Sequence, residues 1–293
     1  MKLDKHEVAR RFVGLPPEGQ KTFLKALREK GIDFGQLPIC QARNNDDTAV
    51  LSYAQARQWF LWQLEPQGTE YHINGALKLK GALNVEALKA CFDALVARHE
   101  SLRTVFRAGD DGLAVQVVQP ECKAWVEEID LSDVETERDE MVQVAASRLL
   151  QTPFDLTTGP LLRVGLIRAA VDEHLLVVVM HHIVSDGWSM QIIVNEFVAQ
   201  YAARVQNKLP QLSTLPIQYA DYAIWQRSWL EAGEQERQLA YWKNQLGDEH
   251  PVLQLQTDRP RRLDGRYRAA IHSLTLPDAL QKNLQKRAHA EGA

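Results

Sequence analysis

The chain has 293 residues, of which 45% are hydrophobic and 25% are charged, so it is long and apolar enough to bury a sizeable core. Its 34 Lys and Arg residues against 38 Asp and Glu residues give a net charge of -4, which provides no reason to expect nucleic acid or an anionic membrane as a partner. Widely spaced cysteines, no apolar signal core and no apolar run longer than Leu175–Met180 favour a reduced, cytoplasmic protein without a membrane span.

The N-terminal part of the chain predicts two short helices separated by a break at Leu15–Glu18. The polar stretch Asn44–Asp47 follows and is typical of a linker. We expect residues 1–45 to form a helical appendage or linker, which is either a solvated helical face or a docking segment.

The remaining chain interleaves helical and strand patterns. Apolar residues at helical spacing predict helices over Ser52–Leu64, Asn84–His99, Glu135–Leu150, Met190–Gln206, Tyr219–Leu230, Gln235–Leu246 and Asp278–His289. Strands are predicted over His72–Leu79, Leu102–Phe106, Leu113–Val118, Leu161–Arg168, His174–Met180 and Ala270–Leu276, with a hairpin turn at Gly109–Gly112. This order predicts a layered α/β fold with a mixed β-sheet and flanking helices.

The feature that carries chemistry is a strand ending in His181 and His182, with Asp186 and Gly187 following. A histidine can move a proton near neutral pH, and a glycine permits a sharp turn. Because adjacent residues of a strand point to opposite faces, we expect one histidine to face a cleft and the other to face the core. That split, and the lack of a third ligand at zinc spacing, predict no metal site.

Nothing near the two histidines has the pattern of an activated nucleophile. Ser185 and Ser189 lack the glycine pattern of a hydrolase strand–elbow–helix turn. We therefore favour direct transfer over a covalent acyl-enzyme. The alternative is two ordinary histidines at a strand end, with Asp-Gly as a simple turn.

Five segments of the chain are similar, in order, to the motifs of one known family. They are Leu51–Phe60, Arg98–Phe106, Pro153–Arg163, His181–Ser189 and Tyr219–Gln226. The stretch His181–Ser189 resembles the His-His-x-x-x-Asp-Gly motif, and the five segments together resemble those of the nonribosomal peptide synthetase condensation domains. The resemblance implies a chloramphenicol acetyltransferase-like lobe, with residues 46–250 as the N-terminal lobe and residues 251–293 as a connection and the start of a second lobe. We expect a chain truncated before that second lobe is complete, with little turnover alone.

The resemblance also implies the reaction and the roles of the site residues. Condensation domains join aminoacyl or peptidyl thioesters held on the 4'-phosphopantetheine arms of an upstream donor and a downstream acceptor carrier domain, beside an adenylation domain. His182 is then the catalytic residue, as a base or as a group that positions the amine. The supporting residues implied are His181, Asp186, Gly187, Arg103 and Arg57, and Trp188 and Ser189 line the substrate tunnel.

Within that set, Asp186 is expected to form an ion pair with Arg103 or Arg57, and the Gly187 N–H to help hold the oxyanion. The residues after Asp-Gly resemble the subtype that couples an L-configured donor to an L acceptor. Two alternatives stay open. One is a free-standing acyltransferase that uses a soluble acyl thioester, and the other is a non-catalytic carrier-binding fragment.

Overall fold

The computed structural model describes residues 4–42, 48–109, 112–248, 253, 256 and 274–292. The chain divides into two units, Met1–Gln245 and Leu246–Ala293. In the described part of the second unit, α9 (Asp278–Ala290) confirms the last predicted helix. The predicted strand Ala270–Leu276 and the Asn44–Asp47 linker lie mostly or wholly outside the described residues.

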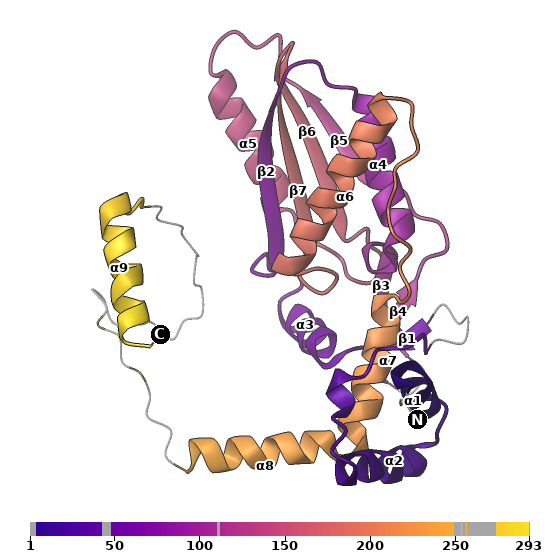
Figure 1. The fold of residues 1–293 in the computed structure, drawn as a ribbon. Coiled ribbons are helices and arrows are strands. Elements are labelled where there is room, and N and C mark those ends of the chain that lie inside the picture. The colour runs from indigo at the N-terminus through magenta and orange to yellow at the C-terminus, as the bar shows by residue number, and fades with distance from the viewer. Residues whose placement is uncertain are drawn as a thin grey trace. The chain divides into compact units, whose positions relative to one another are not determined.

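A four-stranded sheet forms the centre of the first unit (Figure 1). Its strands in spatial order are β2 (His72–Lys80), β7 (Glu173–His181), β6 (Leu162–Ala170) and β5 (Trp125–Asp130). The pair β5–β6 is parallel, whereas β6–β7 and β2–β7 are antiparallel. The predicted mixed sheet is therefore confirmed, although the sequence did not reveal β5.

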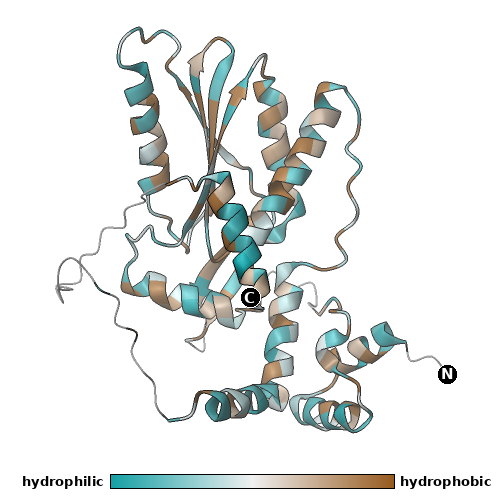
Figure 2. Cartoon of the chain, turned by 60° about the vertical axis from the view of Figure 1, so that its left-hand side comes forward, coloured by the Kyte–Doolittle hydropathy of each residue, from teal (hydrophilic) through white to brown (hydrophobic). Residues whose placement is uncertain are grey.

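Helices cover both faces of this sheet. Helix α5 (Arg138–Gln151) packs on one face, where Leu149 joins Val177 and Val179 in a buried cluster. On the other face, α4 (Val85–Arg98) and α6 (Gly187–Val205) pack on a cluster that contains Leu176 and Met180. Alternate residues of β7 thus face opposite layers, as strand geometry requires. In Figure 2, hydrophobic and hydrophilic residues alternate along these flanking helices.

A second, smaller sheet has the order β1 (Thr48–Val50), β4 (Ala114–Val118) and β3 (Thr104–Ala108), all antiparallel. The predicted hairpin corresponds to β3–β4, and residues 110 and 111 of its turn lie outside the described residues. The short helix η2 (Glu100–Arg103) joins α4 to β3. Helix α3 (Tyr53–Leu64) follows β1.

The N-terminal segment packs on α7 (Tyr219–Trp229). It contains α1 (Lys5–Val13), α2 (Pro17–Glu29) and η1 (Phe34–Gln36). Buried side chains of the three elements, including Phe12, Leu24 and Phe34, share one cluster with Trp225. The Phe34 ring stacks on Trp225 with centroids 6.1 Å apart. The boundary at residue 45 stays a prediction.

After α7 the chain kinks within Leu230–Glu234, where Ala232 and Gly233 are not helical, and then forms α8 (Gln235–Leu246). Gly233 at this kink has φ 102°, a backbone conformation that favours glycine. Among the described residues, no helix is both long and apolar enough to cross a membrane.

Candidate active site

Strand β7 ends at His181, and the chain makes a tight turn before α6 begins at Gly187. Two backbone hydrogen bonds hold this motif turn (residues 182–186). The N–H of His182 donates to the carbonyl of Tyr71 at 2.8 Å, and the N–H of Val184 donates to the carbonyl of His181 at 3.1 Å. The turn therefore has a defined position relative to β2, the neighbouring strand.

The two motif histidines face different surroundings, as strand geometry predicts. His181 is buried, with 4% of its surface exposed, whereas His182 is exposed. Burial, reinforced by the charges of His72 and His182, lowers the pKa of His181 to about 4. His181 is therefore neutral near pH 7, and its Nδ1 accepts a hydrogen bond from the N–H of Ile183 at 3.1 Å. This bond puts the ring proton on Nε2 and fixes the start of the turn.

A tight group of side chains surrounds His181. The rings of His72 and Phe154 both lie 6.3 Å from the His181 ring, centroid to centroid. The His72 Nδ1 is 2.9 Å from the carbonyl oxygen of Leu150, at the end of α5. The guanidinium of Arg163 stacks over Phe154 at 4.3 Å. Strand β2 and the segment after α5 thus shape the pocket of the buried histidine.

Asp186 caps the N-terminus of α6. Its Oδ1 accepts hydrogen bonds from the N–H of Ser189 at 2.7 Å and from the Ser189 hydroxyl at 2.6 Å. These bonds lower the pKa of Asp186, and the nearby His182 lowers it further. The first N–H groups of a helix need acceptors, and the positive end of the helix favours a carboxylate there.

The predicted ion pair between Asp186 and Arg103 or Arg57 is wrong for the residues that the structure describes. Arg103 instead lies 3.7 Å from Glu100 and donates to the carbonyl of Gln119. Arg57 is exposed on α3. The helix terminus satisfies Asp186 locally, so the carboxylate needs no cation.

The other two predicted residues begin α6. Gly187 is the first residue of the helix, and its N–H makes no hydrogen bond to any described residue. Trp188 is 81% exposed. The open N–H of Gly187 can donate a hydrogen bond, and the exposed imidazole of His182, earlier in the same motif, can exchange a proton.

The motif segments Leu51–Phe60 and Tyr219–Gln226 are joined to each other, and the first of them also contacts the motif turn. The hydroxyls of Ser52 and Tyr219 lie 3.0 Å apart, and the amide of Gln226 accepts the N–H of Tyr53 at 3.0 Å. Gln55, in the first turn of α3, donates from Nε2 to the carbonyl of Ile183 at 3.5 Å. The segment Leu51–Phe60 therefore contacts both His181–Ser189 and Tyr219–Gln226.

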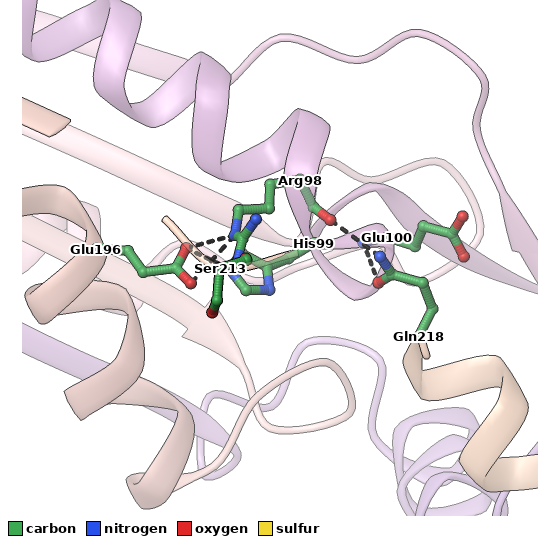
Figure 3. Close-up of polar contacts among 6 residues, drawn as sticks. All are labelled: Arg98, His99, Glu100, Glu196, Ser213 and Gln218. Carbon is green, nitrogen blue, oxygen red and sulfur yellow. Dashed lines mark hydrogen bonds and ion pairs between the residues drawn. The ribbon is translucent and has the colours of Figure 1, made fainter. Parts of the chain in front are cut away.

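The second motif segment contacts α6 and the chain before α7 (Figure 3). Arg98 and His99 both bind Glu196, and Gln218 bridges to the backbone of Arg98 and Glu100. Sequence reasoning missed Glu196 and Gln218. A usable signal existed for Glu196, which is the only charged residue between Gly187 and Ala203.

In the described residues, no group of three or more His, Cys, Asp or Glu side chains is placed to hold a metal ion. The site consists of one exposed imidazole, an open backbone N–H and a carboxylate that is already bound. Such a set suits proton transfer and the binding of a developing oxyanion.

Comparison with known proteins identifies relatives over nearly the whole chain. The family model described as "Condensation domain" matches residues 45–293. A linear gramicidin synthase of Brevibacillus parabrevis is 43% identical over 271 residues, which are 91% of this chain and 3% of that protein. Cyclosporin synthetase simA of Tolypocladium inflatum is 42% identical over 237 residues, which are 80% of this chain and 2% of that protein.

Solved structures agree with this similarity. The X-domain from teicoplanin biosynthesis is 30% identical, with a TM-score of 0.72, over 87% of this chain and 56% of that chain. The first condensation domain of the calcium-dependent antibiotic synthetase is 25% identical, with a TM-score of 0.67, over 84% of this chain and 56% of that chain. The chain thus spans about half of these solved domains and a small part of the synthetases it resembles.

Proposed function

This chain belongs to the condensation-domain family, and from that premise we propose that it forms amide bonds in nonribosomal peptide synthesis by His182-centred direct acyl transfer. The observation that carries the proposal is that His182 is exposed, whereas the neighbouring His181 is buried, on the short turn that leads into α6 at Gly187. The mixed α/β lobe resembles that of the solved condensation domains.

In the proposed reaction, the α-amine of the acceptor attacks the carbonyl carbon of the donor thioester. A C–N bond forms, the C–S bond breaks, and the donor arm leaves as a thiol. His182 either takes the proton lost by the amine or positions the amine for attack. The N–H of Gly187 donates to the oxygen that becomes negative in the tetrahedral intermediate.

The neighbouring residues support these two groups. His181 anchors the motif turn from the core, and Asp186 fixes the first turn of α6. Arg103 is proposed to act indirectly, by holding η2 through Glu100. Trp188 and Ser189 are proposed to line the substrate tunnel, although the Ser189 hydroxyl is engaged by Asp186.

We propose as partners the donor and acceptor carrier domains, which bring their 4'-phosphopantetheine arms, and the adenylation domain of the same synthetase. The residues that follow Asp-Gly, Trp188–Ser189–Met190, support an L-configured donor and an L acceptor. We propose that the reaction takes place in the cytoplasm, where the three free cysteines of the chain stay reduced.

The deciding experiment is His182→Ala in the full-length protein, with His6→Ala on the exposed surface of α1 as the matched control. Transfer between loaded carrier domains is followed by mass spectrometry of the acceptor carrier. We expect loss of transfer in the first variant and normal transfer in the control, with both proteins folded. Full activity of the His182→Ala variant would remove His182 from the mechanism. A parallel reaction with an acyl-coenzyme A donor tests the free-standing acyltransferase.

A second candidate is a non-catalytic interaction module. The observation in its favour is the 30% identity, with a TM-score of 0.66, to the X-domain that has been solved in complex with OxyB. That domain shows a fold of this kind bound to another protein. Titration of this chain with a holo carrier domain separates the candidates, because an interaction module binds its partner and shows no transfer at any partner concentration.

A further inference from the structure

Glu196, in the middle of α6, is shared by two side chains from the C-terminal end of α4 (Figure 3). The Nε of Arg98 donates to both of its carboxylate oxygens at 3.1 Å. The Nε2 of His99 lies 2.8 Å from Oε2. The side chains of all three residues are only 13% to 20% exposed, so water screens these contacts weakly.

The same group reaches the chain before α7. Arg98 also donates from Nη2 to the carbonyl of Ser213. The Gln218 side chain donates to the carbonyl of Arg98 at 3.1 Å and accepts the N–H of Glu100 at 3.2 Å. We call Arg98, His99, Glu196, Ser213 and Gln218 the Glu196 clamp. It joins the end of α4, the middle of α6 and the segment that leads into α7.

The clamp and the motif turn share a cavity of about 90 Å³. His99 of the clamp lines it together with Ser185 of the turn and Ser189 at the start of α6. Helix α6 runs without interruption from Gly187 to Glu196. At the helical rise per residue, these two positions lie about 14 Å apart, so a tilt of roughly 5° about Glu196 moves Gly187 by about 1 Å.

We propose that Glu196 is a positioning residue for the transfer reaction, which holds α6 at the angle that places Gly187 and the turn carrying His182. This inference rests on the proposed function. Glu196 touches no reacting atom and acts only through the helix that begins at the site. A displacement of about 1 Å at a reacting group costs on the order of 100-fold in rate, which makes a rigid clamp effective.

The experiment compares Glu196→Gln with the matched change Glu86→Gln in the full-length protein. Gln keeps the length and one acceptor oxygen, so Arg98 and His99 retain a partner and the fold is maintained. Glu86 lies in the first turn of α4 and contacts Lys89 at the surface. We expect Glu196→Gln to lower the transfer kcat by roughly 10-fold or more with the KM for the acceptor carrier unchanged, and Glu86→Gln to change neither.

A double variant tests whether Glu196 works through His182. If it does, Glu196→Gln lowers the residual transfer of the His182→Ala protein by a smaller factor than it lowers that of the parent protein, because only the Gly187 N–H is left to be positioned. As a readout independent of rate, the ¹⁵N signal of the His182 ring should shift in Glu196→Gln and stay in place in Glu86→Gln.

Three results would overturn the inference. One is a Glu196→Gln protein as active as the Glu86→Gln control, and another is a full additive loss in the double variant. The third is a loss of activity that only matches a loss of folded protein. Full transfer by the His182→Ala protein would refute the proposed function rather than the role of Glu196 alone. The inference about Glu196 would then lose its premise.

Discussion

The buried His181 makes the folded state sensitive to acid. Its pKa is about 4 in the folded protein and 6.5 in an exposed histidine. Below pH 6.5 the His181 side chain is protonated in the unfolded chain but stays neutral in the folded protein. The free energy of unfolding therefore falls as the pH falls towards 4. The difference between these two pKa values lowers the free energy of unfolding by about 3 kcal/mol between pH 6.5 and pH 4, and nearly all of this loss has occurred at pH 4.

We predict that His181→Asn removes most of this dependence. The Asn Oδ1 occupies the place of Nδ1 and accepts the N–H of Ile183, but it does not titrate. A smaller slope remains, because burial also lowers the pKa of His72. The free energy of unfolding of both proteins is measured in urea at pH values of roughly 7.5, 6.5, 5.5 and 4.5, which span the titration of histidine. Identical slopes for the variant and the parent would refute this account of His181.

The remaining predictions concern the two ends of the motif turn. Asp186→Ala removes the cap of α6 and should lower the free energy of unfolding by about 1 kcal/mol in urea, whereas Asp186→Asn keeps the cap and should cost much less; equal losses would contradict the capping role. The buried Ser185 hydroxyl has no hydrogen-bond partner in the described protein and lines the cavity shared with His99, so a crystal structure should show ordered water bound to it. Ser185→Val should fill that space and exclude the water, and an unchanged water structure in this variant would refute the assignment.

Much of the fold was predictable because helices and central strands carry strong periodic signals. The uninterrupted apolar run Leu175–Met180 is typical of a central strand, and helices cover both faces of β7. Strand β5 escaped prediction because it lies at a sheet edge and carries Glu127 and Glu128, so its apolar pattern is weak.

The site was predictable where the geometry is local. The alternation of a strand was enough to separate His181 from His182. The partner of Asp186 was not predictable. The sequence motif does not show whether the carboxylate accepts the backbone N–H three residues later in the chain or forms an ion pair with a distant arginine. Glu196 was missed for a related reason, since its role depends on two helices that meet only in three dimensions.

The packing of residues 4–42 on α7 bears on how such proteins are recombined. A chimaera joined between residues 42 and 48 would take α1, α2 and η1 from one parent and α7 from another. The aromatic contact of Phe34 with Trp225 would then depend on two sequences that never evolved together. A junction placed before residue 4 takes Phe34 and Trp225 from the same parent. The N-terminal helices and the lobe on which they pack should therefore be transferred together.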